Sequence, residues 1–457
     1  MSGSSADGLP FPRRGWAILT LGLGLAMAVL TGSLANLALP TISRELGVSA
    51  AESIWVANAY QLAVTMTLLP LASLGEKLGY RRVYLWGLVL FTAASGACAL
   101  AETMPALVAA RVLQGFGAAG VMSVNTALIR FIYPSSQLGR GVGYNALIGG
   151  TTSALGPSIA SVILAVADWH MLFAVNLPLG VLAWLIGRRV LPDNPTADHQ
   201  KFDTASAALN GAFFGLLVLG IDGLGHGQGA FFIGLELSGA AVVGVALVWR
   251  QLSQRNPLLP VDLLMRPVFA LSIAASTFSF VAQSMAFTAL PFFLVVELHR
   301  SQTETGLLMT PWSAAMAVTA LFAGRLSDRF SPALMGGLGQ AVLCTGLVAL
   351  ALLPAAPPAW MPFWLAFVGP AILCGIGFGL FNSPNNRTIM ASAPRARSGG
   401  ASGMQATSRL LGQTIGAALV AMMFNIFPAG GTALVLIVAA CFSAAAGVAS
   451  LFRPRTA

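Results

Sequence analysis

Long apolar runs separated by short charged connectors recur along the whole chain, and this pattern limits the possible folds more than any other feature. Only 9% of the residues are charged while 56% are hydrophobic, so a water-soluble domain of this composition could not keep its surface hydrated. The runs are continuous rather than alternating, which favours helices over the strands of a membrane barrel. Because a helix satisfies its own backbone hydrogen bonds in lipid, the sequence predicts an all-α protein that crosses a membrane many times.

Fourteen runs are long enough to cross a bilayer. The run at 204–222 is the weakest, because Asp203 and Asp222 bracket it. Twelve spans, with residues 204–250 on the membrane surface, is the alternative, and it leaves two apolar runs unburied. We expect the fourteen spans near residues 16–39, 52–74, 81–101, 105–131, 141–166, 170–190, 204–222, 231–250, 268–290, 303–324, 332–353, 362–386, 400–425 and 430–452.

Basic residues lie almost entirely in every second connector. If the N-terminus is cytoplasmic, only Arg44 and Arg300 fall in outer loops. This bias follows the positive-inside rule, and it would collapse if one span in the middle were added or removed. We therefore expect a multi-pass protein of the cell membrane with both termini in the cytoplasm. The same rule accounts for the net charge of +9, so nucleic acid is not an expected partner.

Other functional classes lack the residues that they need. The four cysteines lie singly within apolar runs, and the four histidines lie in connectors or near the ends of runs, so we expect no metal site and no cofactor. A membrane enzyme would need clustered His, Asp or Ser/His groups near an interface, and a channel would need a ring of like polar groups. We expect a monomeric, non-enzymatic protein whose partners are the lipid bilayer and a small-molecule substrate.

An internal repeat divides the chain. Residues 38–40 recur at 289–291, an offset of 251 (289 − 38), and residues 72–78 recur in degenerate form at 324–330, an offset of 252 (324 − 72). Two matches in one register, at equivalent ends of runs, indicate two halves of six helices each. We predict an N-terminal six-helix bundle over 1–190, a linker with an inserted two-helix hairpin over 191–262, and a C-terminal six-helix bundle over 263–457.

The connector from Ala72 to Arg82 resembles the loop signature between helices 2 and 3 of the major facilitator superfamily, Gly-x-x-x-Asp-Arg-x-Gly-Arg-Arg. Gly79 permits a tight turn, because glycine tolerates a positive φ. Glu76 can bind a cation or a helix N-terminus of the other half and so hold one state of a two-state gate. A connector that only sets the topology is the alternative. Four positions are replaced, by Ala72, Glu76, Lys77 and Tyr80, while Gly79, Arg81 and Arg82 lie near or on the pattern.

A dipeptide in the fifth run resembles the signature Gly-x-x-x-Gly-Pro-x-x-Gly-Gly of antiporters in this superfamily. Gly156 allows close approach of a neighbouring helix, and Pro157 removes one backbone hydrogen bond, so the helix can bend there and favour exchange or efflux. A kink that only serves packing is the alternative. With the connector and its repeat, the expected gate residues are Glu76, Gly79, Arg81, Arg82, Gly156, Pro157, Arg325, Asp328 and Arg329.

Further stretches point to one branch of the superfamily. Arg111 opens a stretch that resembles the helix 4 signature, and a membrane arginine is expensive unless it faces water or a partner, so we expect it in the cavity; a snorkelling interfacial arginine is the alternative. The stretch from Trp169 to Gly180 resembles the opening of helix 6 in the fourteen-helix drug:proton antiporter branch, and so do Trp55 to Tyr60 and the surroundings of Arg409. The resemblance implies a multidrug efflux transporter of the major facilitator fold, with two six-helix bundles plus a two-helix hairpin.

One departure from the branch concerns the coupling ion. Thr31 stands where the family pattern places an aspartate, which serves proton coupling or the recognition of cations, and threonine cannot titrate. The other runs hold no deep Asp or Glu, because Asp222, Glu236 and Glu297 lie near outer ends. Proton coupling is therefore implied by the resemblance alone, without an obvious proton carrier among these residues.

The same absence predicts the charge of the substrate. A cavity that holds Arg111 and no acid suits neutral, zwitterionic or acidic amphiphiles better than cations. Aromatic and methionine side chains supply an adaptable wall, here Phe278, Phe287, Phe293 and Met316 besides those named next. The expected substrate-binding residues are Thr31, Asn36, Asn58, Gln61, Arg111, Gln114, Asn125, Gln283, Met309, Trp312 and Gln405.

These expectations combine into a secondary active transporter that works by alternating access and exports small hydrophobic compounds, with protons as the coupling ion that the branch implies. An importer or facilitator of one metabolite, without proton coupling, is the alternative on the same fold, because a fold does not determine function. Thr31 favours that alternative, whereas Gly156 and Pro157 favour export.

Overall fold

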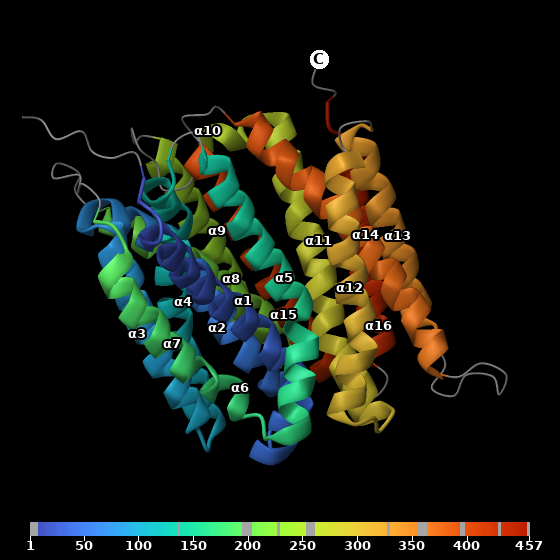
Figure 1. The fold of residues 1–457 in the computed structure, drawn as a ribbon. Helices are drawn as coiled ribbons and strands as arrows, with labels where there is room; N and C mark the ends of the chain where they lie inside the picture. The colour runs from blue at the N-terminus through green and yellow to red at the C-terminus, as the bar shows by residue number, and fades with distance from the viewer. Residues whose placement is uncertain are drawn as a thin grey trace, which may run out of the picture.

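The computed structural model is helical in every regular element that it describes (Figure 1). It describes residues 8–134, 137–193, 203–225, 229–252, 261–326, 330–353, 363–393, 398–427 and 431–454, and at some positions within the helices, many of them in α5, only the backbone.

Each of the fourteen expected runs lies largely within a helix or, for one run, within two consecutive helices. The expected run at 170–190 contains a break at Val175 between α6 and α7, and α11 continues into a π-helical turn over Phe293–Glu297. The helices are α1 (Arg13–Leu46), α2 (Ala50–Leu78), α3 (Tyr80–Ala99), α4 (Met104–Ile132), α5 (Leu138–Val166), α6 (Met171–Ala174), α7 (Asn176–Val190), α8 (Thr204–Gly225), α9 (Ala230–Leu252), α10 (Val261–Leu264), α11 (Pro267–Phe292), α12 (Gln302–Leu326), α13 (Pro332–Ala351), α14 (Phe363–Ser392), α15 (Ser398–Ile426) and α16 (Gly431–Leu451).

Within the described residues, 12 helices are long and apolar enough to cross a membrane, with α6 and α7 counted together as Met171–Val190. Helices α5 and α12 are not among these 12, although they are 29 and 25 residues long. The expectation of fourteen spans is thus supported for twelve helices by length and composition.

Helix contacts fall into two groups that have the same pattern. In the first group α4 packs against α2 and α3, while α1 packs against α5 and α7; in the second group α14 packs against α12 and α13, while α11 packs against α15 and α16. The groups meet along two equivalent seams, α2 with α15 and α5 with α12. The expected repeat is therefore present in the packing of the helices.

Glycines show the same repeat at atomic level. A Cβ atom on Gly117 would lie 2.8 Å from Gly87 O, and one on Gly377 would lie 2.5 Å from Gly339 O, so α3–α4 and α13–α14 touch through their backbones. The offset is 252 for the first glycine of each pair (339 − 87) and 260 for the second (377 − 117). It grows because the connector between α13 and α14 is longer than the one between α3 and α4.

The charged connector at 72–82 is mostly helical. Helix α2 continues to Leu78, and α3 begins at Tyr80, so Gly79 alone makes the corner with φ 98° and ψ 130°. Its amide donates to Gly75 O at 3.0 Å. The expected tight turn is present, and its position is set by a glycine in a backbone conformation that other residues rarely adopt.

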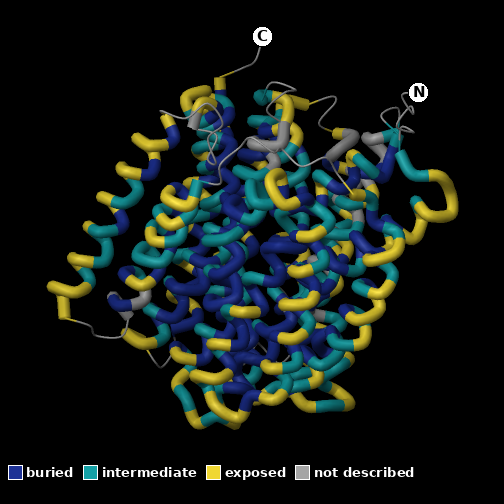
Figure 2. Tube along the Cα trace, turned by 90° about the vertical axis from the view of Figure 1, so that its left-hand side faces the viewer, coloured by how far each residue is buried: buried dark blue, intermediate teal, exposed yellow. Residues whose placement is uncertain are grey.

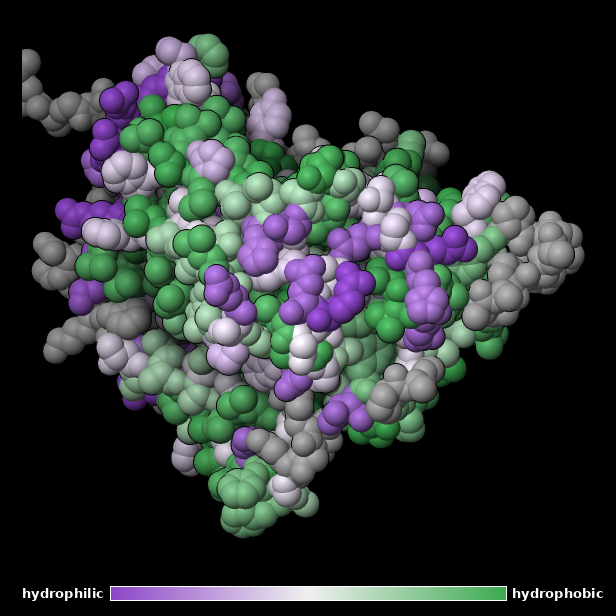
Figure 3. Space-filling model, turned by 90° about the horizontal axis from the view of Figure 1, so that it is seen from below, coloured by the Kyte–Doolittle hydropathy of each residue, from purple (hydrophilic) through white to green (hydrophobic). Residues whose placement is uncertain are grey.

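The apolar core is shared between the groups at one end of the molecule only. The first and last described residues, just before α1 and just after α16, lie at the other end (Figure 2), which we call the terminal end. At the opposite end, where polar side chains gather over the middle of the face in Figure 3, a single cluster joins residues of both groups, among them Ile42, Trp169, Leu290 and Trp312. At the terminal end one cluster consists of first-group residues and Leu410, and another of second-group residues with Leu263 of α10.

Hydrogen bonds also join the two groups towards the opposite end. Ser158 Oγ of α5 lies 2.8 Å from Thr310 Oγ1 of α12, and Gln302 donates through its side chain to Thr41 of α1. With the shared core, these bonds hold the two groups together at the opposite end, while their cores are separate at the terminal end.

Helices α8 and α9 pair with each other, and α8 lies against the seam between α2 and α15. Asn210 Nδ2 of α8 donates to Met66 O of α2 at 2.8 Å. Helix α9 is largely uncovered, because only 11% of the residues in its most apolar stretch are buried. Large apolar side chains such as Phe231 and Trp249 are exposed on it. Such a surface suits contact with lipid.

Candidate functional site

Arg111 of α4 is completely buried, with 0% of its surface exposed. Its Nε donates to Val56 O at 2.7 Å and its NH1 to Gln114 Oε1 at 2.6 Å, while its NH2 lies 3.5 Å from Thr31 O. The guanidinium thus joins α4 to α2 and α1 through neutral acceptors. This geometry excludes the snorkelling alternative, because the charge lies inside the bundle and not at its surface.

Aromatic rings cover the Arg111 charge on two sides. Its guanidinium carbon lies 4.3 Å from the centre of the Tyr60 ring and 5.5 Å from that of Phe173. The Tyr60 hydroxyl donates to Ala28 O at 2.6 Å, which holds the ring against α1. Cation–π contacts of this kind stabilise a desolvated cation without neutralising it.

Gln114 orients Arg111 and is itself held in place. Its Nε2 donates to Ser95 Oγ at 2.7 Å, and the Cys98 thiol points to its Oε1 at 3.7 Å. A buried network in which each member has a partner keeps a single geometry. The assignment of Gln114 to the substrate cavity stays a prediction; in the structure its side chain holds the neighbouring arginine.

Thr31 lies at the contact between α1 and Arg111, with 1% of its surface exposed. Its Oγ1 accepts a hydrogen bond from Asn176 Nδ2 at 3.1 Å, and its backbone oxygen faces the guanidinium. An acidic residue at this position would stand next to the buried arginine. The threonine leaves the charge without a counterion from α1.

Described acidic side chains lie away from this position. They occur in connectors, at the ends of helices, or in α9 and α10, namely Glu45, Glu52, Glu76, Glu102, Asp168, Asp193, Asp203, Glu236, Asp262, Glu297 and Glu304. Within the described part of the chain, no ion pair to Arg111 is found, and the buried charge is uncompensated.

A second polar feature lies on α15. Gln405, Arg409 and Gln413 recur at intervals of four residues, so they share one side of the helix, and all three are half-buried. Leu410, the next residue of α15, lies in the same apolar cluster as Tyr60, so α15 borders the Tyr60–Arg111 contact at this level. Arg409 contributes to the electrostatics of Tyr60. Gln405 is among the expected cavity residues and Arg409 among the family matches, whereas Gln413 is in neither set. The four-residue spacing of polar side chains in an apolar helix is the sequence signal that points to all three.

Some of the other expected substrate residues lie at the seam between α2 and α15, and others lie in the shared core at the opposite end. The Asn58 amide, oriented with its nitrogen towards Thr414, donates to Thr414 O and accepts from Ala418 N, both at 3.3 Å, so it ties α2 to α15. Gln61 is buried, and Asn125 donates to Leu21 O at 3.2 Å. Gln283 points to the Met316 sulfur at 3.5 Å. In the shared core, the Trp312 ring meets that of Phe287 edge-on with centres 5.0 Å apart, and Met309 is buried.

Some buried polar atoms in this region have no hydrogen-bond partner among the described residues. They include Asn36 Oδ1, Thr288 Oγ1 and Trp312 Nε1. Leaving such atoms unpaired costs about 1–3 kcal/mol each. They are therefore groups that a polar ligand could satisfy.

Comparison with known proteins decides the family. The model of the Major Facilitator Superfamily matches residues 21–281 and 271–457, which is nearly the whole chain. The chain belongs to the Major Facilitator Superfamily. It is 51% identical over 446 residues to the uncharacterized transporter YebQ of Escherichia coli, a match that covers 96% of each chain.

More distant relatives of this major facilitator protein have named activities. It is 27% identical to the riboflavin transporter RibZ of Clostridioides difficile, over 90% of this chain and 88% of that protein. It is 30% identical to the multidrug resistance protein Stp of Mycobacterium tuberculosis, over 88% of this chain and 74% of that protein. Among solved structures, a bacterial homolog of the lysosomal transporter Spinster superposes with a TM-score of 0.68 at 15% identity over 98% of both chains, which shows the same fold.

In this major facilitator protein the gate residues that the structure describes do not form one cluster: those at 76–82 lie at the corner between α2 and α3, and Gly156 lies in α5. Glu76 and Arg82 are exposed. Arg81 pairs with Asp193 at 2.8 Å and donates to Arg188 O at 2.6 Å, both just after or within α7 of its own group. Gly156 is buried. The side chains of Pro157 and Arg325, and residues Asp328 and Arg329 altogether, lie outside the described part, so the gate assignment stays a prediction.

A further buried cation lies at the terminal end, just after α16. Arg453 donates through its guanidinium to Asn385 Oδ1, and Asn385 Nδ2 donates to Ser272 O at 3.2 Å. Burial lowers the pKa of Arg453 to about 10, so it remains charged at neutral pH. It fastens the C-terminal helix to α14 and α11.

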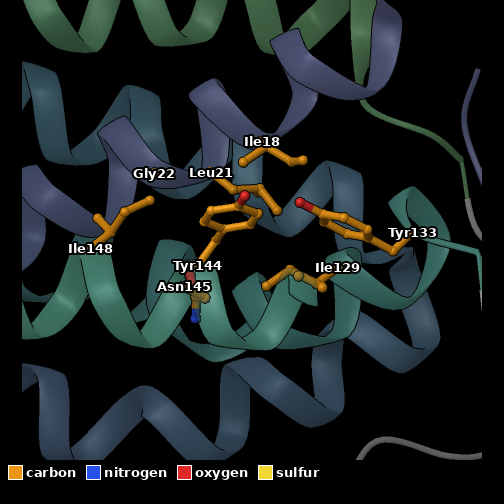
Figure 4. Close-up of a pocket in the computed structure, with 9 residues that line it drawn as sticks. Ile18, Leu21, Gly22, Ile129, Tyr133, Tyr144, Asn145 and Ile148 are labelled. Carbon is orange, nitrogen blue, oxygen red and sulfur yellow. The ribbon is translucent and has the colours of Figure 1, made fainter. Parts of the chain in front are cut away.

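The pocket shown in Figure 4 is too small for a substrate. It lies between α1, the end of α4 and α5, where Tyr144 points towards Leu21 and Gly22 and Tyr133 lies beside Ile129. Its volume is about 10 Å³, which is about the room that one water molecule needs. The candidate site of this transporter is therefore the Arg111 region with the facing side of α15.

Proposed function

We propose that this major facilitator protein is a secondary active transporter that exports small hydrophobic compounds by alternating access. In this proposal fourteen helices cross the cell membrane, with α8 and α9 as an inserted hairpin between a bundle over 1–190 and a bundle over 263–457. Both termini lie in the cytoplasm, which agrees with the basic residues of the connectors at the terminal end.

The observation that carries the proposal is the unequal joining of the two helix groups. One apolar cluster unites them at the opposite end, whereas separate clusters fill them at the terminal end. Two rigid groups that are joined at one end can rock about the site between them and expose it to each side in turn. With the terminal end in the cytoplasm, this arrangement corresponds to the state that takes up substrate from the cytoplasm.

The charge of the site supports a substrate class. Arg111 is buried without a described carboxylate partner, and Thr31 occupies the position that carries an acid in the antiporter branch. A cation would be repelled by this uncompensated charge. Substrates are therefore neutral, zwitterionic or acidic compounds with an apolar body, and Phe173 and Tyr60 offer aromatic surface beside the charge.

Membership of the fourteen-helix drug:proton branch is part of the proposal. Similarity to the multidrug resistance protein Stp supports it, as do the Gly156–Pro157 dipeptide and the motifs in α2, α7 and α15. Proton coupling through the branch would need a carrier other than residue 31, because threonine does not titrate.

Transport by the purified protein in liposomes tests the proposal. An imposed pH gradient should drive the movement of neutral or acidic amphiphiles, and a cationic drug of similar size should move several-fold more slowly. Faster movement of the cationic drug, or no gradient-dependent movement of any compound, would contradict it. A response to membrane potential instead of the pH gradient would remove protons as the coupling ion.

Uptake or facilitated passage of one metabolite is the second candidate. The similarity to the riboflavin transporter RibZ and the absence of an acid at residue 31 favour it. Direction separates the two: in intact cells an exporter lowers the internal concentration of its substrate below that of cells without the protein, whereas an importer or facilitator does not.

A further inference from the structure

Gln405, Arg409 and Gln413 form a half-buried polar stripe on α15, to which the proposed rocking of the two helix groups assigns no role. None of its three side chains has a hydrogen-bond or ion-pair partner among the described residues. Helix α15 itself is held firmly, since Gly403 packs on Leu69 of α2 and a Cβ on Gly412 would lie 2.6 Å from Thr277 O of α11. The stripe is thus a rigid surface with free polar groups.

Arg409 lies well inside α15. It is the twelfth residue of α15, which runs from Ser398 to Ile426, so it lies about 16 Å from one end and about 26 Å from the other at 1.5 Å per residue. An arginine side chain does not span either distance. An ionisable group at such a depth marks a functional site by default, because its burial in lipid without a partner is expensive.

Two cations from different groups of helices act on the same ring. Arg111 of α4 stacks on Tyr60 at 4.3 Å, and Arg409 of α15 interacts electrostatically with Tyr60. The described carboxylates lie in connectors, at helix ends or in α9 and α10. Two positive charges near one aromatic side chain, with no ion-pair partner among the described carboxylates, produce a positive potential that attracts anions into the bundle.

The internal repeat does not require either cation. Helices α5 and α15 have equal lengths and an offset of 260 (398 − 138), so Arg409 corresponds to Gly149 of α5. With the same offset for α4 and α14, Arg111 corresponds to Ala371, which is completely buried. Each arginine therefore departs from the shared scaffold, as expected for residues that serve recognition rather than packing.

We propose that the α15 stripe is the second half of the substrate site and that its ligand is an amphipathic organic anion. Arg409 pairs with the carboxylate or sulfonate of the ligand, Gln405 and Gln413 donate to its polar atoms, and its apolar body lies against Tyr60. Arg111 adds to the positive potential from its stacked position on Tyr60, without leaving its buried partners. This assignment rests on the proposed transport function and names the substrate class for the same site.

Two xanthene dyes of opposite charge provide the test. Fluorescein carries a carboxylate and rhodamine 123 is a cation, while both share one apolar ring system. Binding of each dye to the purified full-length protein is measured by fluorescence anisotropy, for the wild type, Arg409→Gln and Arg409→Lys. Arg250→Gln is the matched control. It removes the same charge far from the proposed site, because Arg250 lies near the end of α9 and pairs with Asp203.

The wild type should bind fluorescein in preference to rhodamine 123. Arg409→Gln should weaken fluorescein binding about 10- to 100-fold, as expected for the loss of a hydrogen-bonded charge pair, while Arg409→Lys keeps part of it and Arg250→Gln keeps all of it. Equal fluorescein binding by Arg409→Gln and the wild type, preference for rhodamine 123, or binding of neither dye would overturn the proposal.

Uptake of fluorescein into liposomes separates this inference from the proposed function. If the wild type and Arg409→Gln move the dye equally, transport stands and the role of Arg409 fails. If Arg409 is required for binding but the wild type moves no dye, the anion site stands and the proposed transport fails.

Discussion

The Arg111 guanidinium donates to the Gln114 side-chain oxygen at 2.6 Å, across one turn of α4. Because Gln114 also donates to Ser95 at 2.7 Å, its amide cannot turn without breaking a buried hydrogen bond. The orientation of the arginine is thus set by a neutral group, and its positive charge remains available to act on whatever enters the bundle.

Arg111→Ala should reduce transport by more than about tenfold, equivalent to about 1.4 kcal/mol, because the charge and its contacts to α1 and α2 are lost. Arg111→Lys keeps the charge but cannot reproduce the fork of donors, so it should retain a small fraction of activity. Transport is measured in liposomes, and insertion is checked by the amount of folded protein in the membrane. Full activity of Arg111→Ala would show that the residue only packs the bundle.

Thr31→Asp should shift the preference of the transporter towards cations. The new carboxylate would stand beside Asn176 and the Arg111 guanidinium and neutralise its charge. Accumulation of a cationic drug in cells should fall several-fold, and handling of acidic compounds should fall as well. Thr31→Asn is the uncharged control of the same size; if it has the same effect as Thr31→Asp, shape and not charge is responsible.

Gly117→Ala should destabilise the protein strongly, because its Cβ would lie 2.3 Å from Phe91 N of the neighbouring helix. Overpacking of this kind costs about 1–3 kcal/mol, and more when backbone atoms must move. Gly369→Ala, in α14, meets nothing within 4 Å and should stabilise its helix by up to about 1 kcal/mol. Opposite shifts in Tm for these two variants are expected, and a similar Tm for both would refute the close contact between α3 and α4.

Asp193→Asn should change stability by less than about 1 kcal/mol, because the side chain of Asp193 is 81% exposed in its pair with Arg81. Arg81→Ala should change stability as little, yet it should slow transport several-fold if Arg81 finds another partner when the terminal end closes. Unfolding in detergent and transport rates are compared for the two variants. An equal loss of transport in both would assign the role of Arg81 to the Asp193 pair.

The helices and the two related groups could be predicted from the sequence, because continuous apolar runs of this length satisfy their backbone hydrogen bonds in lipid as helices. The sequence matches have offsets of 251 and 252, whereas the glycine pairs of the structure add an offset of 260, since the connector between α13 and α14 is longer than the one between α3 and α4. Arg111 was predicted as an interior residue from its neighbours in the helix 4 motif, and the structure agrees.

Other site residues could not be predicted because their roles depend on what faces them. Asn58 is a polar residue in an apolar run, as a cavity residue would be, but its amide forms hydrogen bonds with the backbone of α15. Gln413 lies in an apolar run whose orientation is known only once Gly412 and Gly416 are seen against α11. The gate residues Asp328 and Arg329 stay predictions, because the described part of the chain ends at Leu326 and resumes at Phe330.

The glycine contacts repeat in both helix groups, while the two interior arginines do not. Substitutions at Arg409 can therefore test the proposed substrate preference without touching these glycine contacts. Descendants of such a duplicated ancestor can acquire new cargo one position at a time, each half contributing independently, while the machinery of movement is inherited intact.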